Sequence, residues 1–181
     1  MVGERSQVGS SEMVDRSSAT MIGRLKHDAD AYTEARKNDS LRAVEPSLKL
    51  AVVACMDSRI DLFGLLGLGI GEAHVLRNAG GVVTDDVIRS LVISQRVLGT
   101  ESIVLVHHTD CGLQKITDDG FKDRLEDEIG IRPPWALEGF KDPFVAVRQS
   151  AKRLLHSPFL AHKDHIFLFV YDVDSHRLIP A

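Results

Sequence analysis

The 181-residue chain has few of the residues that mark several large classes of protein. It contains only two cysteines, one tryptophan and two tyrosines, and no apolar run is long enough to cross a bilayer. Its 22 lysines and arginines are outnumbered by 26 aspartates and glutamates, so the formal charge is -4 and no basic cluster favours nucleic acid or an anionic membrane. We therefore expect a cytoplasmic protein that binds neither nucleic acid nor membrane.

The length and the hydrophobic content of 44% suit one domain with a real core. Residues 1–18 are rich in serine, glycine and charge and are expected to form a flexible tail, which leaves residues 19–181 as a single domain. From about Ala19 to residues 37–40, an amphipathic helix is predicted by the apolar stripe Met21, Ile22, Leu25, Ala29 and Tyr32. This stripe must cover the domain's own sheet, which is the usual case, or a partner subunit.

Short apolar runs alternate with amphipathic stretches from residue 50 onward. The runs are too short for helices, rich in β-branched residues and bounded by polar ones, which is typical of buried parallel strands. They cover residues 50–54, 73–76, 103–106 and 166–171, with helices expected at 60–68, 87–98 and 143–155. Residues 113–142 predict short helices and a surface excursion. The pattern predicts an α/β fold with a four-stranded parallel sheet and right-handed crossovers.

Each cysteine follows one of these strands. Cys55 comes directly after the run at 50–54, and His108 and Cys111 lie in the turn after the run at 103–106. Parallel strands would bring both segments to the carboxyl edge of the sheet, where open α/β sheets place their sites. Two thiolates and one imidazole form a zinc-ligand set that leaves the fourth tetrahedral position for water or a carboxylate. Asp57 is the candidate for that fourth ligand in a closed state of the site.

Each of these assignments has an alternative. The cysteines can be ordinary buried residues or can form a disulfide, although metal binding or catalysis is more common in a cytosolic chain. His107 competes with His108, but side chains alternate along a strand and the His-x-x-Cys spacing favours His108. Asp110 is interpreted as a turn residue or a hydrogen-bond acceptor for a ligand. Gly80 and Gly81 predict a close backbone approach to a ligand, to the metal site or to another chain.

Three segments together resemble the β-class carbonic anhydrase family. They are Cys55-x-Asp57-x-Arg59, Arg77-Asn78-Ala79-Gly80 and His108-x-x-Cys111-Gly112, and the similarity runs from about residue 50 to 115. The resemblance implies a parallel core of strand order 2-1-3-4 flanked by helices, assembled as a homodimer or a larger dimer-based oligomer with zinc near the subunit interface. It assigns the zinc ligands to Cys55, His108 and Cys111 and a catalytic aspartate-arginine pair to Asp57 and Arg59.

The chemistry of CO₂ hydration suggests a role for Asp57 and Arg59. Zinc lowers the pKa of bound water from 15.7 to about 7, which supplies hydroxide for attack on CO₂ at neutral pH. Two thiolates make zinc a poorer Lewis acid than three histidines would, so a neighbouring group has to favour ionisation. Asp57 can accept a hydrogen bond from the bound water, and Arg59 can keep that carboxylate ionised and away from the metal.

The sequence therefore predicts a zinc lyase that interconverts CO₂ and bicarbonate. Hydrolysis of carbonyl sulfide or carbon disulfide is the alternative, because enzymes with that activity resemble the same family and share its zinc ligands, aspartate and arginine. A hypothesis from another class is a zinc-stabilised binding domain without turnover, whose site would normally be closed by four protein ligands.

Overall fold

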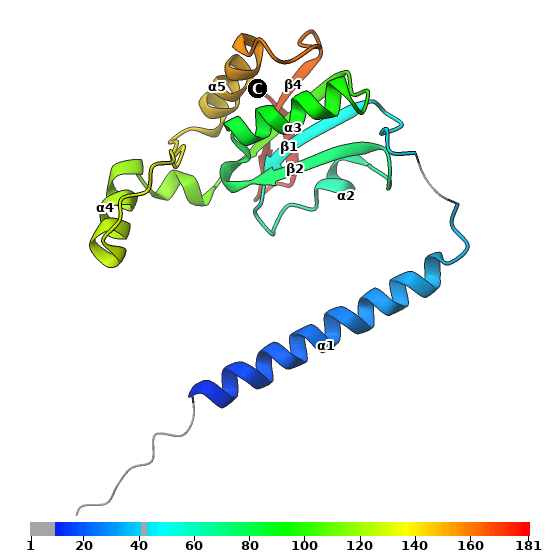
Figure 1. The fold of residues 1–181 in the computed structure, drawn as a ribbon. Helices are drawn as coiled ribbons and strands as arrows, with labels where there is room; N and C mark the ends of the chain where they lie inside the picture. The colour runs from blue at the N-terminus through cyan, green and yellow to red at the C-terminus, as the bar shows by residue number, and fades with distance from the viewer. Residues whose placement is uncertain (1–9, 41–42) are drawn as a thin grey trace, which may run out of the picture. The chain divides into compact units, whose positions relative to one another are not determined.

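The computed structural model describes residues 10–40 and 43–181, with side chains from residue 20 onward. The chain divides into two compact units, Met1–Arg42 and Ala43–Ala181. Helix α1 (Ser10–Arg36) is the secondary structure of the first unit, and every strand and every other helix belongs to the second (Figure 1).

Helix α1 ends at Arg36, close to the predicted end, but it begins nine residues earlier than expected. Residues 10–18, which were expected to belong to a flexible tail, are helical in the structure. The stretch contains neither glycine nor proline, and Glu12, Met13 and Arg16 are strong helix formers, so the helix extends back to the residue after Gly9. Residues 1–9 of the expected tail lie outside the described residues.

The four predicted strands form a parallel sheet. They are β1 (Leu50–Cys55), β2 (Ala73–Asn78), β3 (Ser102–His108) and β4 (Ile166–Asp172). Their order is β2-β1-β3-β4, with every neighbouring pair parallel, so the predicted α/β fold and strand order are confirmed. Because β1 and β3 are neighbours with Ala54 beside Val106, their carboxyl ends meet at one edge of the sheet.

A fifth strand, β5 (Arg177–Pro180), pairs antiparallel with β4 and makes the sheet one strand larger than predicted. A tight turn joins the two strands, in which the Asp172 carboxylate accepts hydrogen bonds from the backbone amides of Asp174 and Ser175. The strand escaped prediction because it has only four residues and ends in proline, which is tolerated at sheet edges but is a poor strand signal.

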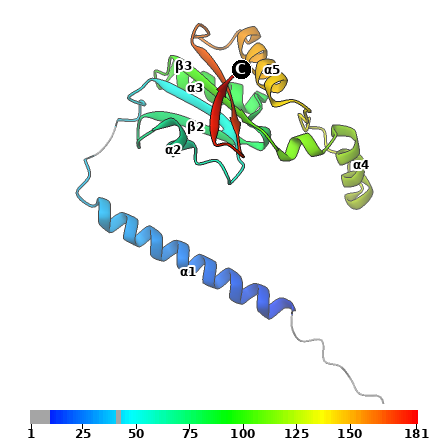
Figure 2. The same ribbon diagram turned by 180° about the vertical axis from the view of Figure 1, so that it is seen from behind.

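Helices cover both faces of the sheet (Figures 1 and 2). Helices α3 (Asp85–Arg96) and α5 (Pro143–His156) pack on one face, where Leu91 and Leu154 join a core with Val53 and Leu105. Helix α2 (Leu62–Leu66) packs on the other face and is shorter than the predicted 60–68, because Gly67 ends it in a left-handed conformation. Cys55 and Cys111 belong to the core on the α2 face.

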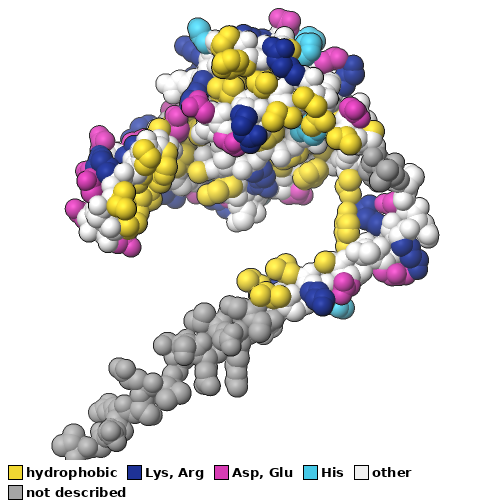
Figure 3. Space-filling model, in the orientation of Figure 1, with side chains coloured by type: hydrophobic (Ala, Val, Ile, Leu, Met, Phe, Trp, Pro, Cys, Tyr) yellow, Lys and Arg dark blue, Asp and Glu magenta, His cyan; other side chains and the backbone are white. Residues whose placement is uncertain are grey.

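The predicted excursion between β3 and α5 contains two short helices, η2 (Gly112–Lys115) and α4 (Asp118–Ile129), and a second 3₁₀ turn, η1 (Ala79–Gly81), follows β2. Helix α4 buries none of its residues, and apolar side chains gather along one side of this excursion (Figure 3). Ile129, Ile131 and Trp135 are among its exposed apolar residues. None of the helices in the described ranges is both long and apolar enough to span a membrane.

Candidate metal centre

The meeting ends of β1 and β3 bring the three predicted zinc ligands together. Cys55 is the last residue of β1, His108 is the last residue of β3, and Cys111 lies at the end of the turn that follows. The two sulfur atoms and a ring nitrogen of His108 all lie within 4.8 Å of one another, and all three side chains are buried. Among the described residues this is the one such group of three or more potential metal ligands.

The protonation of His108 fits a metal site. Its Nδ1 lies 2.8 Å from the carbonyl oxygen of Thr109, and because a carbonyl only accepts, Nδ1 carries the proton. The other nitrogen, Nε2, carries the lone pair in the neutral ring, and it is buried without any hydrogen-bond partner. A buried acceptor without a partner is costly, and a cation beside the two thiols would satisfy it.

The two thiols share one proton. A hydrogen bond from the Cys111 thiol lowers the pKa of Cys55 to about 4, against the effect of burial. The same hydrogen bond and burial raise the pKa of Cys111 above its ordinary range. One thiolate and one thiol therefore lie side by side at neutral pH, and a thiophilic divalent cation has only one proton left to displace. The donor set fits zinc.

His107 points to the opposite face of the sheet, as the alternation of side chains predicts. Its Nε2 lies 3.5 Å from the hydroxyl of Ser150 on α5, and its ring centroid is 5.6 Å from that of Phe140. Burial lowers the pKa of His107 to about 4, so the ring is neutral at neutral pH. His107 is a packed neighbour of the site on the α5 side.

Asp57 and Arg59 form a tight pair beside the thiols. Arg59 donates from Nε to Oδ1 of Asp57 at 3.0 Å and from Nη2 to Oδ2 at 2.8 Å, and its backbone amide also donates to Oδ1 at 2.9 Å. These bonds hold the pKa of the Asp57 carboxyl well below its usual range and raise the pKa of Arg59. Asp57 Oδ2 lies 3.9 Å from His108 Nε2, so the ionised carboxylate faces the site while arginine holds it.

Gly81 explains the predicted close approach of the backbone. Its φ is +68°, and a Cβ there would lie 2.8 Å from the nitrogen of Cys55, 2.9 Å from the carbonyl carbon of Ala54 and 3.1 Å from the oxygen of Val106. Of the three alternatives left open by the sequence, this is the approach to the metal site, because Cys55 is one of the ligand candidates. The η1 turn therefore packs against the ends of β1 and β3 from which the ligands project.

Two contributions to the site did not follow from the sequence. Arg77, at the end of β2, donates from Nε to the carbonyl of Cys55 at 2.8 Å and from Nη2 to the carbonyl of Asp57 at 2.7 Å, which fixes the loop after β1. Asp110 receives hydrogen bonds from Arg59, at its carboxylate and at its carbonyl. Both residues lie within the three family motifs, but no spacing signalled these contacts.

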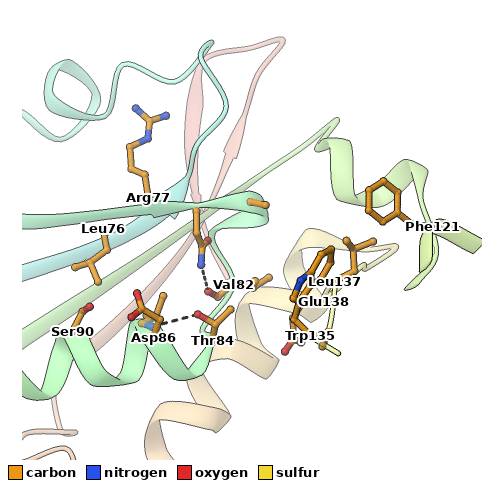
Figure 4. Close-up of a pocket in the computed structure, with 14 residues that line it drawn as sticks. Leu76, Arg77, Val82, Thr84, Asp86, Ser90, Phe121, Trp135, Leu137 and Glu138 are labelled. Atoms are coloured by element: carbon orange, nitrogen blue, oxygen red, sulfur yellow. Dashed lines mark hydrogen bonds between the residues drawn. The ribbon is translucent and has the colours of Figure 1, made fainter. Parts of the chain in front are cut away.

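A hollow of about 700 Å³ lies beside β2 and α3 rather than at the thiols (Figure 4). Phe121 and Trp135 of the α4 excursion face it, and Leu76 points toward α3 while Arg77 points to the other side of β2. The hollow is lined by no cysteine or histidine. The chemistry of the site therefore resides in the ligand group and the Asp57–Arg59 pair.

Comparison with known proteins shows that the sequence is similar to carbonic anhydrases. The sequence model of the family described as carbonic anhydrase matches residues 50–135. The chain is 54% identical over 133 residues to β-carbonic anhydrase 1 of Mycobacterium tuberculosis, covering 74% of this chain and 82% of the relative. It is 30% identical over 177 residues to the carbon disulfide hydrolase of Saccharolobus solfataricus, covering 82% and 86%.

Among solved structures, the carbonic anhydrase of Streptococcus mutans superposes with a TM-score of 0.82 at 39% identity, covering 88% of this chain and 96% of that one. The resemblance inferred from three short motifs thus extends over most of the sequence and over the fold. The chain belongs to the β-carbonic anhydrase family.

Proposed function

We propose that the protein is a zinc enzyme that reversibly hydrates CO₂ to bicarbonate. The observation that supports this most is the buried group of Cys55, His108 and Cys111 beside an ionised aspartate. These three ligands would leave one position of a four-coordinate zinc for water. The identity of 54% to a β-carbonic anhydrase points to the same reaction.

The three buried residues would hold the zinc through two sulfurs and His108 Nε2. When bound, zinc supplies Lewis-acid activation of water, whose pKa it lowers from 15.7 to about 7. The hydrogen bond from His108 Nδ1 to the Thr109 carbonyl fixes the tautomer and the ring orientation that this requires.

Asp57 would orient the attacking water. Its Oδ1 already accepts two hydrogen bonds from Arg59, whereas Oδ2 accepts one and lies nearer to His108. Oδ2 therefore keeps a lone pair with which it could accept a hydrogen bond from the water and direct the water oxygen toward carbon. Arg59 keeps this carboxylate ionised and binds both of its oxygens, so that it would not take the fourth position of a bound zinc.

Stopped-flow CO₂ hydration by the zinc-loaded protein tests the proposal. Arg59→Ala should lower kcat by about 10- to 100-fold while zinc stays bound, because it removes the group that holds Asp57. Cys111→Ser should lose zinc and activity together. Zinc loss in Arg59→Ala with unchanged activity per zinc, or equal rates in the wild type and Cys111→Ser, would contradict the assignment.

The carbon disulfide hydrolase of Saccharolobus solfataricus, at 30% identity over most of both chains, keeps a second activity open. The chemistry is analogous, since an activated water attacks the central carbon of a linear molecule. Assays with CO₂, carbonyl sulfide and carbon disulfide on the same preparation separate the two proposals. A larger kcat/KM for the sulfur substrates would replace the first proposal by the second.

A zinc-stabilised domain without turnover has less support. Structural zinc sites are normally closed by four protein ligands, and here the nearest further candidate, Asp57, is paired with Arg59. Binding of one zinc with no activity toward any of the three substrates would favour this hypothesis.

We also propose a homodimer, or a dimer-based oligomer, in a reducing compartment such as the cytoplasm. Met21, Ile22, Leu25 and Tyr32, which belong to the apolar stripe of α1, are each more than half exposed. A second copy of the chain can cover this stripe. The reducing compartment follows from the chemistry, because metal binding needs both cysteines free. That residues 19–181 act as one domain stays a prediction.

A further inference from the structure

We propose that Asp110 is a positioning residue that holds Arg59 in the orientation in which it pairs with Asp57. The inference rests on the proposed function, since it concerns the pair that would orient the attacking water. It assigns a specific task to a side chain in the turn between two of the candidate ligands.

The guanidinium of Arg59 is fixed along both of its edges. Its Nε and Nη2 face the two carboxylate oxygens of Asp57 at 3.0 and 2.8 Å. On the other side, Nη1 donates to Oδ2 of Asp110 at 2.8 Å, and Nη2 donates a second bond to the Asp110 carbonyl at 3.0 Å. A planar group held by two carboxylates at opposite edges cannot rotate without breaking one pairing.

The backbone of Asp110 also contributes to holding Arg59. Its φ is +52°, in the left-handed region that aspartate, asparagine and glycine tolerate best. In this conformation its carbonyl and its carboxylate contact the same guanidinium. The second carboxylate oxygen, Oδ1, lies 2.8 Å from the Lys115 ammonium, so each of the two carboxylate oxygens of Asp110 has its own cationic partner.

The contact joins the two loops that carry the ligand candidates. Asp57 and Arg59 follow β1 and Cys55, whereas Asp110 lies between His108 and Cys111 after β3. The side chains of Arg59 and Asp110 are 48% and 49% exposed, and a single ion pair at such exposure is mobile and weak. The two-edged arrangement compensates for this exposure. Without Asp110, Arg59 would keep one edge pairing and could swing into solvent, which would free Asp57 to turn toward the thiols.

Two substitutions at position 110 test the proposal in the zinc-loaded enzyme. Asp110→Gly keeps a backbone suited to positive φ and removes the carboxylate, and Asp110→Asn keeps the shape but removes the charge. We expect kcat for CO₂ hydration to fall about tenfold in Asp110→Gly at full zinc occupancy, and less in Asp110→Asn. Asp85→Asn is the matched control, because Asp85 is also an exposed carboxylate bonded to an arginine, Arg153, at 2.8 Å, and its kcat should not change.

A double-mutant cycle separates an effect through Arg59 from a general disturbance of the turn. If Asp110 acts through Arg59, Asp110→Gly should lower kcat by less than about twofold when it is introduced into Arg59→Ala. A tenfold loss in both backgrounds would mean that position 110 acts through its neighbour Cys111, and it would overturn the proposal. An unchanged kcat in Asp110→Gly alone would overturn it as well.

A measurement without turnover completes the test. In ¹⁵N NMR of the zinc-loaded protein, with the Arg59 Nε–H signal assigned from Arg59→Lys, exchange of this proton with water should become about tenfold faster in Asp110→Gly, as expected for the loss of the hydrogen bonds at one edge. Equal exchange would refute the proposal. Slow exchange in the wild type, faster in the variant, combined with no CO₂ hydration by either protein, would support the positioning role and refute the proposed function.

Discussion

At the scale of single residues, Gly81 controls how closely the η1 turn approaches the two ligand-bearing strands. It combines a φ of +68° with contacts to the backbone of β1 and β3, so a side chain would be opposed by backbone conformation and by backbone atoms that cannot move aside. Gly99 has a similar φ of +73°, but no neighbouring atom lies within 4 Å of the position that a Cβ would occupy there. The two glycines therefore separate conformational strain from steric contact.

We expect Gly81→Ala to lower the free energy of unfolding of the zinc-loaded protein by about 3 kcal/mol, the sum of left-handed strain and close contact. Gly99→Ala should lower it by only about 1 kcal/mol, because strain alone applies. Denaturant titrations of both variants measure the difference, and zinc content shows whether Cys55 has moved. Equal losses in the two variants would show that the close contact contributes nothing.

Residue identities revealed the ligand candidates in advance but not the contacts that orient them. Cys55, His108 and Cys111 are recognisable because rare metal-binding side chains follow buried strands, and strand alternation separates His107 from His108. The contacts of Asp110 and Arg77 depend on a left-handed turn and on the lateral spacing of β1 and β2. No local pattern encodes either of these, so they became visible only in three dimensions.

At the scale of secondary-structure elements, one carboxylate at the start of α4 binds the loop that follows this helix. Asp118, the first residue of α4, accepts hydrogen bonds from the backbone amides of Leu137, Glu138 and Gly139 at 2.9, 3.3 and 3.0 Å. These bonds, that of Gly139 foremost, lower the pKa of Asp118. A carboxyl with a lowered pKa in the folded state gives stability that is present at neutral pH and is lost as the pH falls through that pKa.

Asp118→Ala should release this loop without unfolding the sheet, because α4 buries none of its residues. We expect hydrogen exchange of the amides of residues 137–139 to become at least about tenfold faster, since each loses its acceptor. Asp119→Ala is the control, because its side chain is 92% exposed and contacts only Arg132 among the ion pairs. Unchanged exchange in Asp118→Ala would mean that other contacts hold the loop.

The elements themselves were predictable where burial gives a strong pattern. The four parallel strands are apolar runs because both of their faces are covered. Helices α3 and α5 directly follow Thr84 and Asp142, whose side chains cap the first turn. Strand β5 and the start of α1 were missed for opposite reasons. β5 is an edge strand of only four residues that ends in proline, and residues 10–18 form helix although their sequence has no apolar periodicity.

At the scale of the whole molecule, the apolar stripe of α1 is the feature that a second copy would explain. Met21, Ile22, Leu25 and Tyr32 are each more than half exposed. An exposed apolar stripe of this width favours association, because burying it removes apolar surface from water.

Leu25→Glu should therefore shift the sedimentation coefficient toward the monomer at micromolar concentration, since it introduces a charge into the stripe. Ala31→Glu is the matched control, because it adds the same charge to α1 outside the stripe and should leave the mass unchanged. An unchanged mass with a lower midpoint of thermal unfolding in Leu25→Glu would show that the stripe packs within its own chain.

The single hydrogen ion held between Cys55 and Cys111 has a consequence for how the protein acquires its metal. With one sulfur already ionised, the two cysteines release one hydrogen ion instead of two when a dication binds. The affinity for the metal should then rise about tenfold, rather than a hundredfold, for each unit by which the pH increases near neutrality. The protein would thus retain its metal when the pH falls modestly, whereas a site whose two thiols are both protonated would lose its metal under the same change.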